Sequence, residues 1–221
     1  MEALYHKSGN RWCPLLTLHG AGGHGSAGVL SRGAVVVFDA SAGVEPQSET
    51  VWRQADKYNV PRIVYVNKMD RVGADFLAVV GQIQNELGSN AVPLTLPIGV
   101  EKDFCGIIDL VAQCAVYYDD DDRGRTFREE PIPAALKAEA SRWRHFLIEK
   151  AAEADARLLE KFCGDEEISA AELKAAVRAA THARRICPVL CGSAFKNKGI
   201  QRLLDAVVDY LPSPVDLPPV I

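Results

Sequence analysis

The sequence predicts an α/β fold in which a sheet is flanked by helices and an α+β subdomain is inserted. Short apolar runs rich in β-branched residues alternate with segments of helical periodicity, as in layered α/β domains. Residues 93–185 separate two of these runs, and this is far more chain than an ordinary connection needs. With 221 residues, of which 48% are hydrophobic, the chain can bury a core of this kind.

The first strands and helices follow from periodicity. Strands are expected at Ala34–Asp39 and Arg62–Val66. A helix is expected at Pro46–Tyr58, because proline is favoured in the first turn. The helix expected at Asp75–Leu87 has an apolar stripe made of Phe76, Val79, Val80, Ile83 and Leu87.

The C-terminal part returns to the same pattern, with a strand at Val189–Cys191 and a helix at Ile200–Tyr210 that Pro212 ends. We therefore divide the chain into a divergent Gly-rich leader, a core in two pieces, an insert and a linker end. The leader is residues 1–32, and the core is residues 33–92 together with 186–212. The insert is residues 93–185, and the linker end is residues 213–221.

The insert has a β part followed by a helical part. Ile107–Val111 and Ala115–Tyr118 are expected to pair as strands within a β-like part that spans residues 94–118. Helices are expected at Pro133–Phe162 and Ser169–Thr181, the second opened by a capping box. The acidic run at residues 119–122 lacks the glycine and the distal glutamate of a calcium loop, so we interpret it as a solvated turn.

Two polar loops that follow apolar runs carry the chemistry, and they are Asn67-Lys68-Met69-Asp70 and Gly192-Ser193-Ala194. Guanine presents a ring N–H and an amino group side by side, and a carboxylate such as that of Asp70 accepts both. Such a site rejects adenine by roughly 10⁴-fold in the best cases, because a buried acceptor would be left unpaired. The first loop alone is also compatible with an ordinary strand-to-helix connection. The second loop makes that alternative improbable.

The other residues of the two loops have distinct expected roles. The stem of Lys68 is expected to cover the purine face with its ammonium in solvent. Asn67 is expected to tie its own loop together and to meet the base on its other edge. The backbone N–H of Ala194 is expected to donate to the guanine oxygen, and Ser193 to orient Asp70.

Several segments together resemble bacterial translation elongation factor G. They are Gly33–Ala40, Gly43–Ala55, Val66–Phe76, Gly192–Gly199 and Leu204–Pro212. The resemblance implies part of a P-loop GTPase-type sheet that binds GTP or GDP, and a cytoplasmic factor that acts in ribosomal translocation. It implies that the insert contacts the ribosomal stalk protein. The guanine-binding residues it supports are Asn67, Lys68, Asp70, Ser193, Ala194 and Phe195.

The phosphate half of the family's site is absent from this sequence. The chain has no Gly-x-x-x-x-Gly-Lys-Ser/Thr loop, whose backbone N–H groups cradle phosphates, and no Asp-Thr-Pro-Gly-His segment. We therefore expect no catalytic residues, no GTP hydrolysis by the chain alone, guanine binding weaker than micromolar, and Mg²⁺ only with the missing phosphate site. The alternative function is a non-catalytic module that binds the stalk protein through the insert.

The first 32 residues do not resemble the family. Residues 19–28 form a Gly-rich stretch that we interpret as a flexible lead-in, arising from a foreign leader or a reading-frame disruption. Without the family's preceding strand, Ala34–Asp39 is expected to have an unpaired edge and to self-associate. As an alternative, Leu15–His19 takes the place of the missing strand.

Composition excludes several classes of protein. No apolar stretch reaches the ~20 residues of a membrane span, and the net charge of -4 gives no general attraction to nucleic acid. The cysteines form no Cys-x-x-Cys pair and are expected to be buried free thiols rather than zinc ligands. Their positions are Cys13, Cys105, Cys114, Cys163, Cys187 and Cys191.

Overall fold

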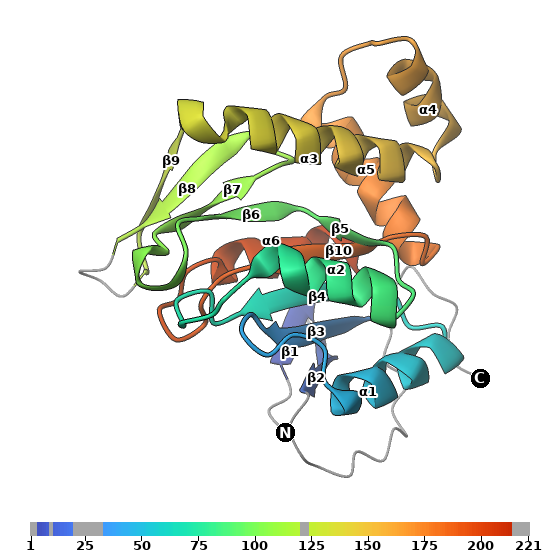
Figure 1. Ribbon diagram of the computed structural model, residues 1–221. Helices are drawn as coiled ribbons and strands as arrows, with labels where there is room; N and C mark the ends of the chain where they lie inside the picture. The colour runs from blue at the N-terminus through green and yellow to red at the C-terminus, as the bar shows by residue number, and fades with distance from the viewer. Residues whose placement is uncertain (1–3, 9–10, 20–32, 120–123, 214–221) are drawn as a thin grey trace.

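A central sheet and a smaller second sheet organise the chain, as the computed structural model in Figure 1 shows. The structure describes residues 4–8, 11–19, 33–119 and 124–213, with side chains from residue 33 onward. The central sheet has the strand order β1-β2-β3-β4-β10-β5. Its strands are β1 (Leu4–Ser8), β2 (Arg11–His19), β3 (Ala34–Asp39), β4 (Arg62–Asn67), β10 (Cys187–Cys191) and β5 (Ala91–Pro93).

From β2 to β5 the strands of this sheet are parallel, and β1 adds an antiparallel edge. The flanking helices are α1 (Pro46–Lys57), α2 (Phe76–Glu86) and α6 (Ile200–Tyr210), which confirms the three expected helices. Helix α2 begins where the carboxylate of Asp75 accepts the N–H of Ala78 at 2.9 Å. The α/β fold class is therefore confirmed.

Strand β3 has a neighbour on each side. Leu16–His19 of β2 pairs in parallel with Ala34–Val37, and β4 pairs with the other edge. The expected open edge is wrong, and the alternative in which residues 15–19 fill it is confirmed. Because both edges of β3 are paired, β3 cannot pair with a strand of a second molecule. The Gly-rich residues 20–28 lie outside the described part of the chain.

The insert contains the second sheet, which is antiparallel in the order β6-β7-β8-β9. Its strands are β6 (Thr95–Ile98), β7 (Gly106–Asp109), β8 (Cys114–Tyr118) and β9 (Phe127–Glu130), and a 3-10 turn, η1 (Glu101–Asp103), joins β6 to β7. The pairing of β7 with β8 was predicted. Strand β9 was not, because its four residues are all exposed and carry no apolar alternation.

The helices of the insert are α3 (Ala134–Ala152), α4 (Ala156–Cys163) and α5 (Ala170–His182). The single helix expected at residues 133–162 is wrong, because the chain turns after α3 and Asp155 starts a new helix. Its carboxylate accepts the N–H of Arg157 at 2.9 Å. The capping box is confirmed, with Glu172 Oε2 3.0 Å from the N–H of Ser169.

The expectation that the thiols are buried holds for Cys187 and Cys191 alone among the five cysteines with described side chains. Burial raises the pKa of both thiols to about 12. Cys163 is exposed, because it ends α4 on the outside of the insert, and Cys105 and Cys114 are half-buried. All five are free. The side chain of Cys13 lies outside the described residues.

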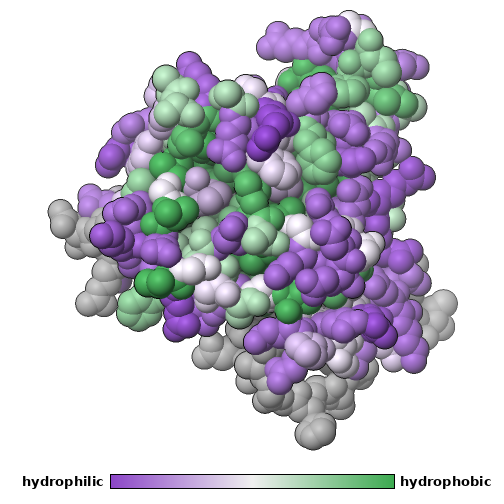
Figure 2. All heavy atoms as spheres, in the orientation of Figure 1, coloured by the Kyte–Doolittle hydropathy of each residue, from purple (hydrophilic) through white to green (hydrophobic). Residues whose placement is uncertain are grey.

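The surface is mixed in character on the face that Figure 2 presents. Hydrophilic side chains cover its lower right, where α1 lies, and apolar side chains are visible nearer its centre. Asp119 is exposed, as expected for a solvated turn, and the rest of the acidic run is not described. Within residues 33–119 and 124–213, no helix is both long and apolar enough to cross a membrane.

Candidate functional site

The two predicted loops lie side by side at the carboxyl ends of β4 and β10. These strands are parallel neighbours, so their ends meet at one edge of the sheet. Gly192 N–H donates to the carbonyl of Val66 at 3.0 Å, and Met69 N–H donates to the carbonyl of Gly192 at 3.1 Å. The backbone therefore fixes the spacing of the loops before any side chain contributes.

Asn67 joins the loops through its side chain. Its Oδ1 accepts the N–H of Lys68 at 2.8 Å and the N–H of Ala194 at 2.9 Å. The bond to Lys68 confirms that Asn67 ties its own loop together, and the bond to Ala194, which was not predicted, joins this loop to the second one. Without a base in the site, the N–H of Ala194 donates to Asn67, and its expected bond to the guanine oxygen stays a prediction.

Lys68 is held by a carboxylate from a third strand. Its Nζ lies 2.5 Å from Oδ2 of Asp39, the last residue of β3, and Lys68 itself has a φ of 64°. The side chain is 41% exposed, as a solvated ammonium requires, but the ion pair with Asp39 was not predicted. Strand register explains the meeting, because Asp39 pairs with Asn67 across β3 and β4.

Asp39 is strongly stabilised as a carboxylate. Ser41 donates to its Oδ1 through N–H at 3.0 Å and through Oγ at 2.7 Å. Burial raises the pKa of Asp39, but the hydrogen bonds from Lys68 and Ser41 outweigh it and lower that pKa to about 2. Sequence reasoning missed Asp39. Its position at the end of a strand parallel to β4 is the signal that points to it.

Asp70 is the acceptor predicted for guanine, and its side chain is 16% exposed. Lys196 Nζ lies 4.0 Å from its Oδ2. The hydroxyl of Ser193 accepts the N–H of Lys196 at 3.3 Å rather than bonding to Asp70. Ser193 therefore shapes its own loop here, and its role in orienting Asp70 stays a prediction.

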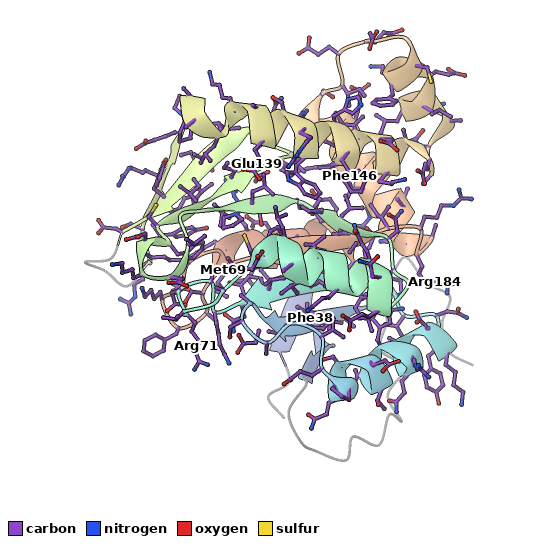
Figure 3. The ribbon with its side chains drawn as sticks, viewed as in Figure 1. Phe38, Met69, Arg71, Glu139, Phe146 and Arg184 are labelled. Carbon is purple, nitrogen blue, oxygen red and sulfur yellow. The ribbon has the colours of Figure 1, made fainter. Side chains whose placement is uncertain are left out.

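Residues of the two loops differ in how far they are buried. Met69 is fully buried, whereas Phe195 is 95% exposed at the tip of the second loop. Figure 3 shows Met69 inside the molecule and Arg71 at its outer edge. Arg71 Nη1 lies 3.9 Å from Oδ2 of Asp39, so it adds a second cation beside that carboxylate.

Gly192 is required by close packing at the start of the second loop. A Cβ at this position would lie 2.2 Å from Oη of Tyr65 and 2.3 Å from the carbonyl oxygen of Lys198. Neither neighbour moves easily, because Tyr65 Oη donates to that same carbonyl at 3.1 Å and is buried. The side chain of Tyr65 thus packs under the Gly192-Ser193-Ala194 loop on the core side of the sheet edge and stabilises it.

The carboxylates of the site can accept hydrogen bonds from the edge of a planar ring that carries N–H donors. The charged groups gathered here are carboxylates and ammonium groups, and they do not form a pair of nucleophile and general base. Within the described ranges 33–119 and 124–213, no cluster of three or more His, Cys, Asp or Glu side chains is placed to hold a metal ion. The arrangement fits recognition of a base.

Comparison with known proteins matches most of this sequence to a family. The family described as the elongation factor Tu GTP binding domain matches residues 26–213. A crystal structure of a protein from Thermus thermophilus is similar, with a TM-score of 0.75 and 30% sequence identity. The similarity covers 84% of this chain and 27% of that chain, so the chain spans about a quarter of that protein's length.

Replacing Gly192 by alanine should destabilise the protein. We expect the free energy of unfolding to fall by about 1–3 kcal/mol, because the new methyl group would overlap Tyr65. Urea denaturation measures the change. Gly81→Ala in α2 is the control, since no atom lies within 4 Å of its added Cβ. It should stabilise the helix by about 0.5–1 kcal/mol, and an equal loss in both variants would contradict the argument.

Asp39 should make stability depend on acid pH. Its pKa of about 2 in the folded chain lies below the ordinary value of 3.8, so its contribution is complete above that value. The contribution is lost as the pH falls through about 2. Wild type should therefore lose more free energy of unfolding between about pH 5 and about pH 2.5 than Asp39→Asn. Urea denaturation at both pH values decides, with exposed Asp103→Asn expected to behave like wild type.

Proposed function

The chain belongs to the elongation factor Tu GTP-binding domain family, and from this premise we propose that its two loops recognise the guanine base of GTP and GDP. The observation that carries the proposal is the 2.9 Å hydrogen bond from Ala194 N–H to Asn67 Oδ1, because it unites loops that are far apart in sequence. The proposed guanine-binding residues are Asn67, Lys68, Asp70, Ser193, Ala194 and Phe195.

Recognition depends on matching donors to acceptors. Asp70 accepts the ring N–H and the amino group of guanine, and its partial burial makes an unmatched base costly. The stem of Lys68 covers one face of the base while Asp39 holds its ammonium. Phe195 is free to cover the opposite face, because its ring is exposed at the loop tip.

We further propose that the domain serves a cytoplasmic factor like elongation factor G, which couples GTP to ribosomal translocation. The sequence resemblance and the insert between the two loops support this role. The chain by itself should bind guanine nucleotides more weakly than micromolar and should not hydrolyse GTP. The reason is that phosphoryl transfer rests on phosphate and Mg²⁺ contacts, and the motifs that supply them are absent from the sequence.

Replacing the carboxylate of Asp70 by an amide, which can donate a hydrogen bond, tests whether this residue recognises guanine. In Asp70→Asn, the amide can donate to the second carbonyl of xanthosine but no longer accepts both guanine donors. We expect guanosine affinity to fall at least about tenfold and xanthosine affinity to rise, as measured by calorimetry. Asp103→Asn is the control on an exposed carboxylate. A wild-type chain with no preference for guanosine over adenosine would refute base recognition.

The same titrations test the missing phosphate half. Guanosine, GDP and GTP should bind wild type with equal affinity, since only the base makes contacts. Tight GTP binding that depends on Mg²⁺ would contradict this part of the proposal while leaving base recognition intact.

A second candidate function is protein binding through the insert. Helices α3 and α4 lie on the far side of the insert from β3 and β4, and Leu159 of α4 is 44% exposed there. We propose that this face binds the ribosomal stalk protein. Leu159→Glu should weaken binding of purified stalk protein at least about tenfold, because it places a charge in an apolar contact. Leu204→Glu on α6, a similarly exposed leucine elsewhere, should leave it unchanged, and equal loss would refute the assignment.

A further inference from the structure

The first turn of the insert contacts the guanine loop that contains Asp70. Glu101 N–H donates to the carbonyl of Met69 at 3.1 Å, and Glu101 Oε1 accepts the N–H of Gly73 at 2.8 Å. These two bonds hold the loop on either side of Asp70. One residue of the insert therefore fixes both ends of the segment that presents the predicted acceptor.

The same turn also contacts the second guanine loop, through Lys198. Lys198 is 1% exposed, and its Nζ donates to the carbonyl of Phe104 at 3.3 Å. The backbone of Lys198 pairs with Ser193 through N–H···O bonds of 3.0 and 2.9 Å. A buried ammonium is retained only where it is hydrogen-bonded, so this lysine links the turn to the Ser-Ala loop.

The turn is held in an unusual conformation. Glu101 has a φ of 52° and Gly99 a φ of 76°, and a Cβ on Gly99 would lie 2.0 Å from the carbonyl oxygen of Asp103. A non-glycine residue with positive φ costs of order 1 kcal/mol and persists only where its surroundings fix it. The contacts with Met69 and Gly73 are such surroundings, since Glu101 makes both in this conformation.

We propose that Glu101 is a positioning residue for guanine recognition, which couples the insert to the base site. The inference rests on the proposed function, because it assigns Glu101 the task of holding the Met69–Gly73 segment ready to receive the base. A preorganised acceptor binds more tightly, since binding then orders less of the chain. By linkage, guanine binding and the docking of this turn strengthen each other.

Substitutions at Glu101 separate its side-chain contact from its backbone. Glu101→Ala removes the acceptor for Gly73, Glu101→Gln keeps an oxygen at the same distance, and both retain a Cβ at the same φ. We expect Glu101→Ala to weaken guanosine binding about fivefold, as for one lost hydrogen bond, and Glu101→Gln to stay within about twofold of wild type. Lys102→Ala, an exposed neighbour in the same turn, should match wild type.

Hydrogen exchange of the full chain provides a second readout that needs no ligand. The Gly73 amide should exchange at least about fivefold faster in Glu101→Ala than in wild type or Glu101→Gln, because its acceptor is lost. Glu101→Asp is a second variant, needed if Glu101→Ala unfolds the turn. It retains the charge on a side chain too short to reach Gly73, so the Gly73 amide should exchange as fast as in Glu101→Ala. Unchanged exchange at Gly73 in both shortened variants overturns the inference. Absence of guanosine binding in wild type overturns the proposed function instead, and exchange still decides whether Glu101 holds the loop.

Discussion

The parallel pairing of β4 with β10 is the constraint on which the site depends. Val64, Val66 and Val189 are fully buried at this pairing, so apolar burial on both faces holds two segments that the whole insert separates. Once the strands are paired, their carboxyl ends bring Asn67 and Ala194 within hydrogen-bonding distance. The side-chain contact thus follows from strand packing, and it would be unattainable without that packing.

Burial on both faces also explains which elements the sequence predicts well. The core strands are continuous apolar runs, so β3, β4 and β10 stand out, whereas β9 is exposed along its length and leaves no hydrophobic pattern. The break between α3 and α4 was missed because Glu153, Ala154 and Asp155 interrupt no apolar stripe. The N-cap preference of Asp155 is a local signal, and here it outweighs the helix propensity around it.

The candidate site could be predicted from the sequence only where its residues lie within a single loop. Asn67 and Asp70 belong to a compact motif after a strand, and the structure brings that motif beside the Ser-Ala loop. Asp39 and Glu101 were missed because their roles arise from contacts between segments far apart in sequence. Their residue types alone are ordinary at a strand end and in a surface turn. The strand register and the sheet topology place these residues beside their partners, and neither can be deduced from a single sequence.

The charges around the site separate base recognition from phosphate binding. Lys68 and Arg71 both face Asp39, and Lys196 faces Asp70, so each of these three cations already has a carboxylate within 4.0 Å. A phosphate placed here would compete with those carboxylates and would also be repelled by them. A planar donor edge is not repelled in this way, since it presents hydrogens to the oxygens of Asp70, although Lys196 Nζ lies 4.0 Å from one of them. The electrostatics of the described residues therefore favour the base over the phosphates.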